Sequence, residues 1–108
     1  MHWHKLTSFS DWDEAKKESF KHKILVFKHS TTCSISLAAL GRFERKWSEE
    51  IGIKPYFLDL LSFRDISNQI AIDTKVIHQS PQIIVLENGE SLYNASHNGI
   101  DAEDLLEI

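Results

Sequence analysis

The sequence has a single cysteine, Cys33, and therefore cannot form a disulfide within the chain. Small secreted domains usually carry an even set of cysteines, and this chain does not. Cys33 is consequently either a small buried residue or a thiol that reacts with a molecule outside the chain. A lone cysteine is more often structural, so its residue type alone gives odds of reactivity of roughly one in four.

Positive charge is also in the minority. The chain has 12 lysines and arginines and 16 aspartates and glutamates, which gives a net charge of −4. Nucleic acids and anionic membranes both attract clustered basic side chains, so we expect neither as a partner. Apolar runs such as residues 83–86 are much shorter than the ~20 residues that a membrane helix needs. The first residues lack the apolar core of a secretory signal, and we therefore expect a cytoplasmic protein.

Glycine and proline are few, with four and two residues, and no repeat, linker or low-complexity segment is present. The chain has 108 residues, of which 42% are hydrophobic and 26% are charged. A chain of this size can bury one core without disulfides, whereas two domains would each be too small. We therefore expect residues 1–108 to form a single domain.

Hydrophobic periodicity predicts strands and helices in alternation. Strands are expected at residues 3–6, 24–28, 53–60, 82–87 and 90–94, with Asn88-Gly89 as a strong hairpin signal between the last two. Helices are expected at residues 9–23, 33–51, 63–73 and 101–106. Ser8 with Asp11, and Ser62 with Asp65, have the spacing of capping boxes.

The longest expected helix starts at Cys33 and ends before Gly52. Its apolar residues recur at intervals of three and four, which predicts an inward face made of Leu37, Leu40, Phe43, Trp47 and Ile51. Crossover helices imply parallel strands in the first half of the chain, and the hairpin adds an antiparallel pair. We expect an α/β fold in which a mixed β-sheet is flanked by helices on both faces.

Cys33 lies where a strand pattern passes through four polar residues into a helical pattern. A thiol at a helix N-terminus faces unpaired backbone N–H groups and the positive end of the peptide dipoles, and both favour the thiolate. Lys28 and His29 could add positive charge. Neighbours in a strand point to opposite faces, so at most one of these two is expected to point toward the sulfur.

This element order, with a cysteine at a strand-to-helix junction, resembles the thioredoxin superfamily over nearly the whole chain. The residues that carry the resemblance are Cys33, Ser80-Pro81, the strand at 82–87 and Asn88-Gly89. Residues 32–36 and 78–82 look most like the YtxJ-like monothiol bacilliredoxins, bacterial proteins linked to the low-molecular-weight thiol bacillithiol. The resemblance implies a thioredoxin-like fold in which Pro81 is cis and lies beside the sulfur. Without it a trans bond is favoured, because only about 5–6% of X–Pro bonds are cis.

The chain departs from the dithiol thioredoxins at two positions. Ser36 stands where they have a second cysteine, and Phe27 where they have a buried aspartate. Ser34 also replaces a proline that is usual in the matching motif. Cys33 can therefore form a mixed disulfide, but an outside thiol or another redoxin must resolve it. The resemblance implies a monothiol oxidoreductase that acts on S-bacillithiolated proteins, with bacillithiol as co-substrate and no bound cofactor.

Cys33 is the expected catalytic residue. Residues expected to contact substrate are Thr32, Ser34, Ser36, Ser80 and Pro81, although Ser34 and Ser36 could simply bond backbone amides of the first helical turn. His78 either binds acidic groups of a thiol substrate or lies in solvent. No metal site is expected, because one cysteine and six scattered histidines do not offer four ligands at zinc-site spacing.

Two other functions stay open. The chain could be a thioredoxin-like binding module whose cysteine is inert. A minor thiol peroxidase activity is also compatible with Ser30, because peroxiredoxin-like sites place threonine or serine three residues before the nucleophile. Comparing the wild type with Cys33→Ser distinguishes the binding module from the oxidoreductase, since a pure binding module would bind its partner equally well in both forms.

Overall fold

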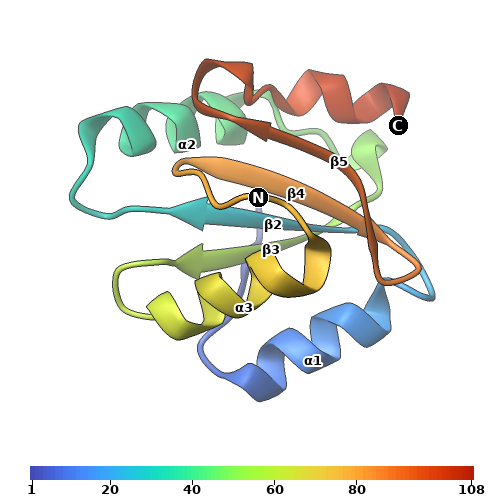
Figure 1. The fold of residues 1–108 in the computed structure, drawn as a ribbon. Helices are drawn as coiled ribbons and strands as arrows, with labels where there is room; N and C mark the ends of the chain where they lie inside the picture. Colours follow the sequence, from blue (N-terminus) through green and yellow to red (C-terminus); the bar gives the residue numbers. More distant parts are fainter.

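The strands of the computed structural model, which describes residues 1–108, form one mixed sheet (Figure 1). Strands β1, β3 and β2 are parallel, whereas β4 and β5 are antiparallel to their neighbours, and the order is β1-β3-β2-β4-β5. This confirms the mixed sheet that the sequence predicts. The bounds are β1 (His4–Lys5), β2 (Ile24–His29), β3 (Lys54–Asp59), β4 (Gln82–Glu87) and β5 (Glu90–Ser96).

Helices cover both faces of this sheet, as predicted. Figure 1 shows α1 and α3 on one face, and α2 together with the last short helix on the other. None of these helices combines the length and the apolar character needed to cross a membrane. They are α1 (Phe9–Glu18), α2 (Ser34–Lys46) and α3 (Arg64–Thr74), with three 3₁₀ helices, η1 (Glu49–Ile51), η2 (His97–Gly99) and η3 (Ala102–Glu107).

Strand β2 is buried along its whole length because helices cover it on both sides. Its side chains alternate between two cores. Ile24 and Val26 pack toward α1 and α3, whereas Leu25 and Phe27 pack toward α2. The central strand therefore ties both cores to the loop that carries Cys33.

Helix α2 is shorter than predicted, and its predicted inward face is confirmed except at Leu37. It ends at Lys46, and the chain is extended at Trp47 before Ser48 caps η1 by accepting a hydrogen bond from the Glu50 backbone N–H. Phe43 and Ile51 are buried and Leu40 and Trp47 pack against the same core, as predicted, whereas Leu37 is 52% exposed. Ser36 and Ala39 are buried as well. Apolar periodicity missed Ser36 because a buried serine with hydrogen-bond partners counts as polar in a sequence pattern.

One predicted cap is confirmed and the other is wrong. Ser8 Oγ accepts a hydrogen bond from the Asp11 backbone N–H at 3.0 Å and starts α1. Helix α3 instead begins after Phe63 without a side-chain cap. The Ser62 hydroxyl donates to Asp59 Oδ2 at 2.9 Å instead of accepting a backbone N–H of α3.

The C-terminal helix is a 3₁₀ helix, η3, rather than an α-helix. Asp101 caps it, as expected for the first residue of this segment, because its Oδ1 accepts from the Glu103 backbone N–H at 2.9 Å. Ala102 and Leu105 are buried and contribute to the core beneath α2. The short helix therefore extends the cover of this sheet face.

The Asn88-Gly89 hairpin is confirmed, with φ of 55° and 77° at the two residues. The end of α1 holds this turn in place. Ser19 accepts the Asn88 backbone N–H through its carbonyl at 2.8 Å and the Gly89 backbone N–H through its Oγ at 2.9 Å. The turn therefore has both local and long-range support.

We expect Gly89→Ala to lower the free energy of unfolding by about 1–2 kcal/mol, the usual cost of a left-handed conformation for a residue with a Cβ. The added Cβ would lie 3.0 Å from Cζ of Phe20, but this ring is 65% exposed and can move aside. Urea unfolding measures the change. Gly99→Ala is the control, because its Cβ meets only Ala95 Cβ at 3.9 Å; equal losses for both variants would contradict the prediction.

Candidate active site

Cys33 is the N-cap residue of α2 and lies half-buried at one end of the sheet. Its backbone is extended, its N–H donates to the Ser30 carbonyl at 3.2 Å, and its carbonyl accepts from the Leu37 N–H at 3.0 Å. No side chain caps the helix and its first turn has no acidic residue. The positive end of the α2 dipole is therefore not neutralised by a carboxylate of the first turn.

Ser36 lies inside the protein rather than beside the solvent-exposed rim of the site. It is fully buried, and its Oγ accepts from the Ser30 backbone N–H at 3.1 Å and lies 2.7 Å from His29 Nδ1. The residue at the second-cysteine position therefore ties the loop before Cys33 to α2. In this arrangement its hydroxyl does not reach a ligand at the surface.

Lys28 and His29 point to opposite faces of the sheet, as strand alternation predicts. The His29 ring lies near the rings of Phe27 and Phe57 on the α2 side, with centroid distances of 6.4 and 5.5 Å. Burial lowers the pKa of His29 and favours the neutral imidazole, although the charges of Asp59 and Glu44 oppose this. Lys28 extends to the α3 side, and neither side chain forms a hydrogen bond or ion pair with Cys33.

Phe27 confirms the absence of a buried carboxylate on the strand that leads to the thiol. Its ring is fully buried and packs at 5.4 Å against Phe43 and at 5.7 Å against Trp3. An apolar residue at this position cannot accept the thiol proton. Cys33 therefore has no buried carboxylate at this position to take its proton.

Ser80 and Pro81 precede β4, which pairs with the strand that leads to Cys33. The peptide bond between Ser80 and Pro81 is cis. Strand β4 pairs with β2 so that Gln82 lies opposite Lys28, which places Pro81 at the same end of the sheet as Cys33 (Figure 1). Pro81 is buried and Ser80 is half-buried. The structure thus brings two segments of the candidate site together that are far apart in the sequence.

Thr32 and Ser34 flank the thiol and are exposed. His78 is half-buried, and it lies neither in solvent nor free in a pocket, because its Nδ1 is 3.2 Å from Lys28 Nζ. Burial, followed by the positive charges of Lys28 and Arg64, lowers the pKa of His78. No group of three or more potential metal ligands is present; the His2 and His4 rings lie 5.1 Å apart, and the His4 ring also lies 5.7 Å from that of Tyr56.

A cavity of about 380 Å³ lies at this end of the sheet and was not predicted. Thr31, two residues before Cys33, lines it together with residues from the ends of β1 and β3. Sequence patterns could not indicate it, because β1 has only two residues and its pairing with β3 is long-range. The lining residues are Lys5, Leu6, Thr7, Thr31, Phe57, Asp59 and Phe63.

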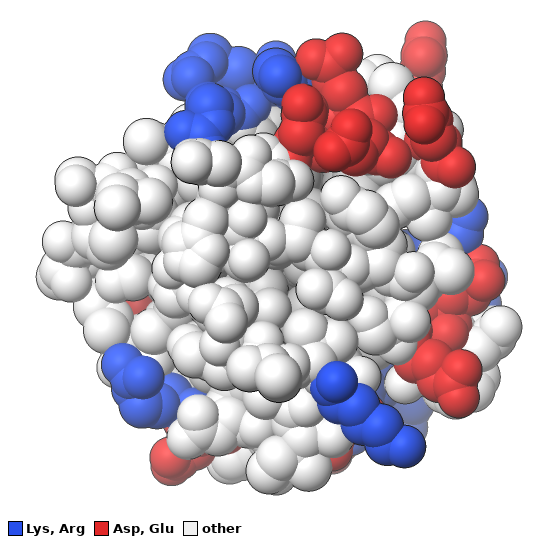
Figure 2. Space-filling model, turned by 45° about the horizontal axis from the view of Figure 1, so that its top comes forward, with Lys and Arg blue, Asp and Glu red and all other residues white.

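Charged side chains are mixed on the face shown in Figure 2. Basic and acidic groups lie side by side at the top of this view, and a broad central area has no charged side chains. Beside Cys33, Ile35 in the first turn of α2 is 60% exposed, and Thr32 and Ser34 are exposed as well. The neighbourhood of Cys33 on α2 therefore offers apolar and hydroxyl groups to an approaching molecule.

Comparison with known proteins identifies the family. Residues 4–105 match the family described as monothiol bacilliredoxin BrxC. The chain belongs to this family. Like dithiol redoxins, this bacilliredoxin is a thiol–disulfide oxidoreductase, and its sole thiol is Cys33.

Solved structures similar to this bacilliredoxin have the thioredoxin fold. One, described as an oxidoreductase with a thioredoxin fold, is 34% identical with a TM-score of 0.82, covering 95% of this chain and 89% of its own. Thioredoxin from Fasciola hepatica is 14% identical with a TM-score of 0.72, covering 96% and 93%. Oxidised thioredoxin from Plasmodium falciparum is 16% identical with a TM-score of 0.74, covering 98% and 96%. The predicted thioredoxin-like fold is therefore confirmed.

Proposed function

We propose that this protein removes bacillithiol from S-bacillithiolated proteins through Cys33. The observation that carries the proposal is a single half-buried thiol at the start of α2 in a member of the monothiol bacilliredoxin family. A buried serine, Ser36, occupies the position at which a dithiol redoxin has its resolving cysteine. The chemistry is therefore limited to steps that one thiol can perform.

In the first step the Cys33 thiolate attacks the bacillithiol sulfur of a protein–bacillithiol disulfide. The target protein leaves as a thiolate and takes up a proton, and bacillithiol stays attached to Cys33 through a new disulfide. In the second step an external thiolate, from bacillithiol or another redoxin, attacks this disulfide and releases Cys33. The electrons that reduce the target thus come from the external thiol.

Thr32, Ser34, Ser80 and Pro81 are the proposed substrate contacts. Thr32 and Ser34 support this role by their exposure beside the thiol, and Ser80-Pro81 by its place at the same end of the sheet. Ser36 has an internal role in this proposal, because both of its polar contacts are to the Ser30 backbone and His29.

Intact-mass measurement after treatment with oxidised bacillithiol tests the proposal. We expect the wild type to gain one bacillithiol, and Cys33→Ser to gain none. Bacillithiolated target protein added to reduced wild type should lose its adduct while Cys33 acquires it. A dithiol bacilliredoxin is the positive control, because the same treatment should oxidise it to an adduct or, after resolution, to an internal disulfide. Absence of an adduct on Cys33 under conditions that oxidise this control would refute the proposal.

A further inference from the structure

Lys28 is a buried lysine without an acidic partner. It is 0% exposed and forms no ion pair. Its Nζ donates to the Ser67 carbonyl at 3.1 Å and lies 3.2 Å from His78 Nδ1. Burying an unpaired charge is costly, and an apolar side chain of similar size is often as stable or more stable at such a position. Stability alone therefore gives no reason for a lysine here.

The contact with Lys28 fixes the protonation of His78. An ammonium group has only donors, so His78 Nδ1 must accept the hydrogen bond and the ring must be neutral, with its proton on Nε2. The Ser67 hydroxyl lies 3.4 Å from the same Nδ1. The lowered pKa of His78 agrees with this form. Lys28 and Ser67 thus attach the segment around His78 to β2 and α3.

A second buried side chain holds the same segment from within. Gln82 is 1% exposed; its Nε2 donates to the Ile77 carbonyl at 3.0 Å, and its Oε1 accepts from the Gln79 backbone N–H at 3.3 Å. Gln82 and Lys28 are direct partners in the β2–β4 register, so their side chains lie on the same face of the sheet. Two adjacent buried polar residues therefore fix residues 77–79 on both sides of His78.

This segment leads directly to the candidate site. Figure 1 shows the connection after α3 running back along the sheet to the start of β4, at the end where β2 continues into the loop of Cys33. Residues 77–79 are followed at once by Ser80 and Pro81. A shift of this segment would therefore move one wall of the site without touching the thiol.

We propose that Lys28 is a positioning residue for disulfide exchange at Cys33, because its buried ammonium fixes His78 and with it the segment that presents Ser80-Pro81 to the substrate. This rests on the proposed function. Lys28 acts on the placement of the substrate disulfide, because its polar contacts are to Ser67 and His78 and none is to Cys33.

The test compares two reactions of Lys28→Met. This variant keeps the side-chain length but removes the donors. Transfer of bacillithiol from a protein disulfide should slow by about 10- to 100-fold, because small misplacements of reacting groups have effects of this size. Alkylation of Cys33 by iodoacetamide, which does not need an aligned disulfide, should be unchanged. Equal slowing of both reactions, or no slowing of transfer, would overturn the proposal.

Two further variants separate positioning from a general loss of structure. Lys23→Met is the matched control, because Lys23 also donates to a main-chain carbonyl, that of Ile108 at 2.9 Å, and should leave transfer unchanged. His78→Asn keeps an acceptor near the position of Nδ1 and should retain transfer, whereas His78→Leu should lose it to the same degree as Lys28→Met. If His78→Leu matches the wild type while still folded, the segment is not held in the proposed way.

The pH profile gives a readout that packing alone would not change. The charged groups acting on His78 are Lys28 from β2 and Arg64 from α3. Protonation of His78 removes the acceptor, so the advantage of wild type over Lys28→Met should vanish as the pH falls through the lowered pKa of His78. Burial lowers the pKa of Lys28 to about 8, but the neutral amine keeps two N–H donors, so the advantage should persist above this pH.

These outcomes are distinguishable from failure of the proposed function. If wild-type Cys33 gains no bacillithiol, the proposed function fails. If the wild type reacts and Lys28→Met transfers bacillithiol at the same rate over the whole pH range, only the positioning role is refuted.

Discussion

Replacing Ser36 by cysteine is expected to convert a protein that holds a bacillithiol adduct into one that expels it. Cys33 is the N-cap of α2 and Ser36 is the third residue of the helix. Side chains three apart on a helix have Cβ atoms about 5–6 Å apart, whereas a disulfide needs Cβ atoms about 3.5–4.5 Å apart. A thiol at position 36 can therefore reach the sulfur of Cys33 once the two Cβ atoms approach by about 1–2 Å, a shift that the N-cap residue Cys33 can make at the end of the helix.

The new thiolate would attack Cys33 in its mixed disulfide, form an intrachain disulfide and release bacillithiol. Well-oriented intramolecular reactions have effective molarities of about 10⁵–10⁸ M at best, far above any concentration of an external thiol. Intact mass after treatment with oxidised bacillithiol measures the result. The wild type should carry the adduct, whereas Ser36→Cys should have no adduct and two hydrogen atoms fewer than its reduced form.

The substitution also has a cost that needs a matched control. Ser36 Oγ is the acceptor for the buried Ser30 backbone N–H, and loss of such an acceptor costs about 1–3 kcal/mol. Ser36→Ala has the same loss without a new thiol, and it should keep the adduct like the wild type. A stable adduct on Ser36→Cys together with a free thiol at position 36 would contradict the prediction.

The parts of the fold that the sequence predicts well are those with strong local signals. Asn88-Gly89 must adopt positive φ, and the continuous apolar run in β2 indicates burial on both faces, so both features follow from short segments. The start of α2 at Cys33 also follows from a local sequence pattern. These signals are sufficient to place the thiol at the end of a central strand.

The remaining features depend on contacts between distant segments. Ser62 has the spacing of a helix cap, but its hydroxyl donates a hydrogen bond to Asp59. Lys28 and His78 are 50 residues apart, and no local pattern indicates that a lysine in an apolar strand is buried against α3. Ser36 is predicted to contact substrate or to bond backbone amides of the first helical turn, yet it is fully buried and its hydroxyl contacts His29 and the Ser30 backbone N–H. Polar side chains inside the core are therefore what sequence reasoning missed.

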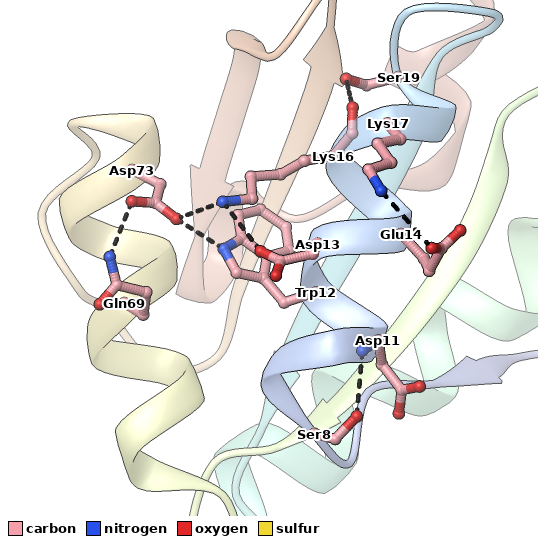
Figure 3. A network of polar contacts seen from close by, with 10 residues as sticks. All are labelled: Ser8, Asp11, Trp12, Asp13, Glu14, Lys16, Lys17, Ser19, Gln69 and Asp73. Carbon is pink, nitrogen blue, oxygen red and sulfur yellow. Dashed lines mark hydrogen bonds and ion pairs between the residues drawn. The ribbon is translucent and has the colours of Figure 1, made fainter.

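Removal of the Trp12 side chain is expected to have the largest effect on stability. Trp12 is 1% exposed, and Trp12→Ala should lower the free energy of unfolding by about 3–5 kcal/mol, a large part of the ~5–15 kcal/mol typical of a domain. Its indole Nε1 donates to Asp73 Oδ2 at 2.8 Å and so joins α1 to α3 (Figure 3). Lys16 donates to the same oxygen at 2.9 Å and Gln69 to Oδ1 at 2.8 Å.

The contribution of the indole N–H can be separated from that of packing by its pH dependence. Partial burial of Asp73 would raise its pKa, but hydrogen bonds from Trp12, Lys16 and Gln69 outweigh this and lower it. A carboxylate whose pKa is lower in the folded state adds stability above the ordinary value of about 3.9, and this stability is lost as the pH falls through the folded value. Trp12→Phe removes one of the three donors and should reduce the contribution of the Asp73 carboxylate to the free energy of unfolding.

The difference in unfolding free energy between wild type and Trp12→Phe should therefore be larger at pH 7 than in acid. Hydrogen bonds also lower the pKa values of Asp11, Glu18 and Asp101, so the wild type alone cannot isolate Asp73. The difference between wild type and Trp12→Phe isolates Asp73, because Asp11, Glu18 and Asp101 are the same in both proteins. Urea unfolding at pH 7 and in acid measures this difference. The same comparison made in an Asp73→Asn protein, which lacks the carboxylate, is the control. A difference that is equal at both pH values would mean that Trp12 stabilises the protein by packing alone, without help from its bond to Asp73.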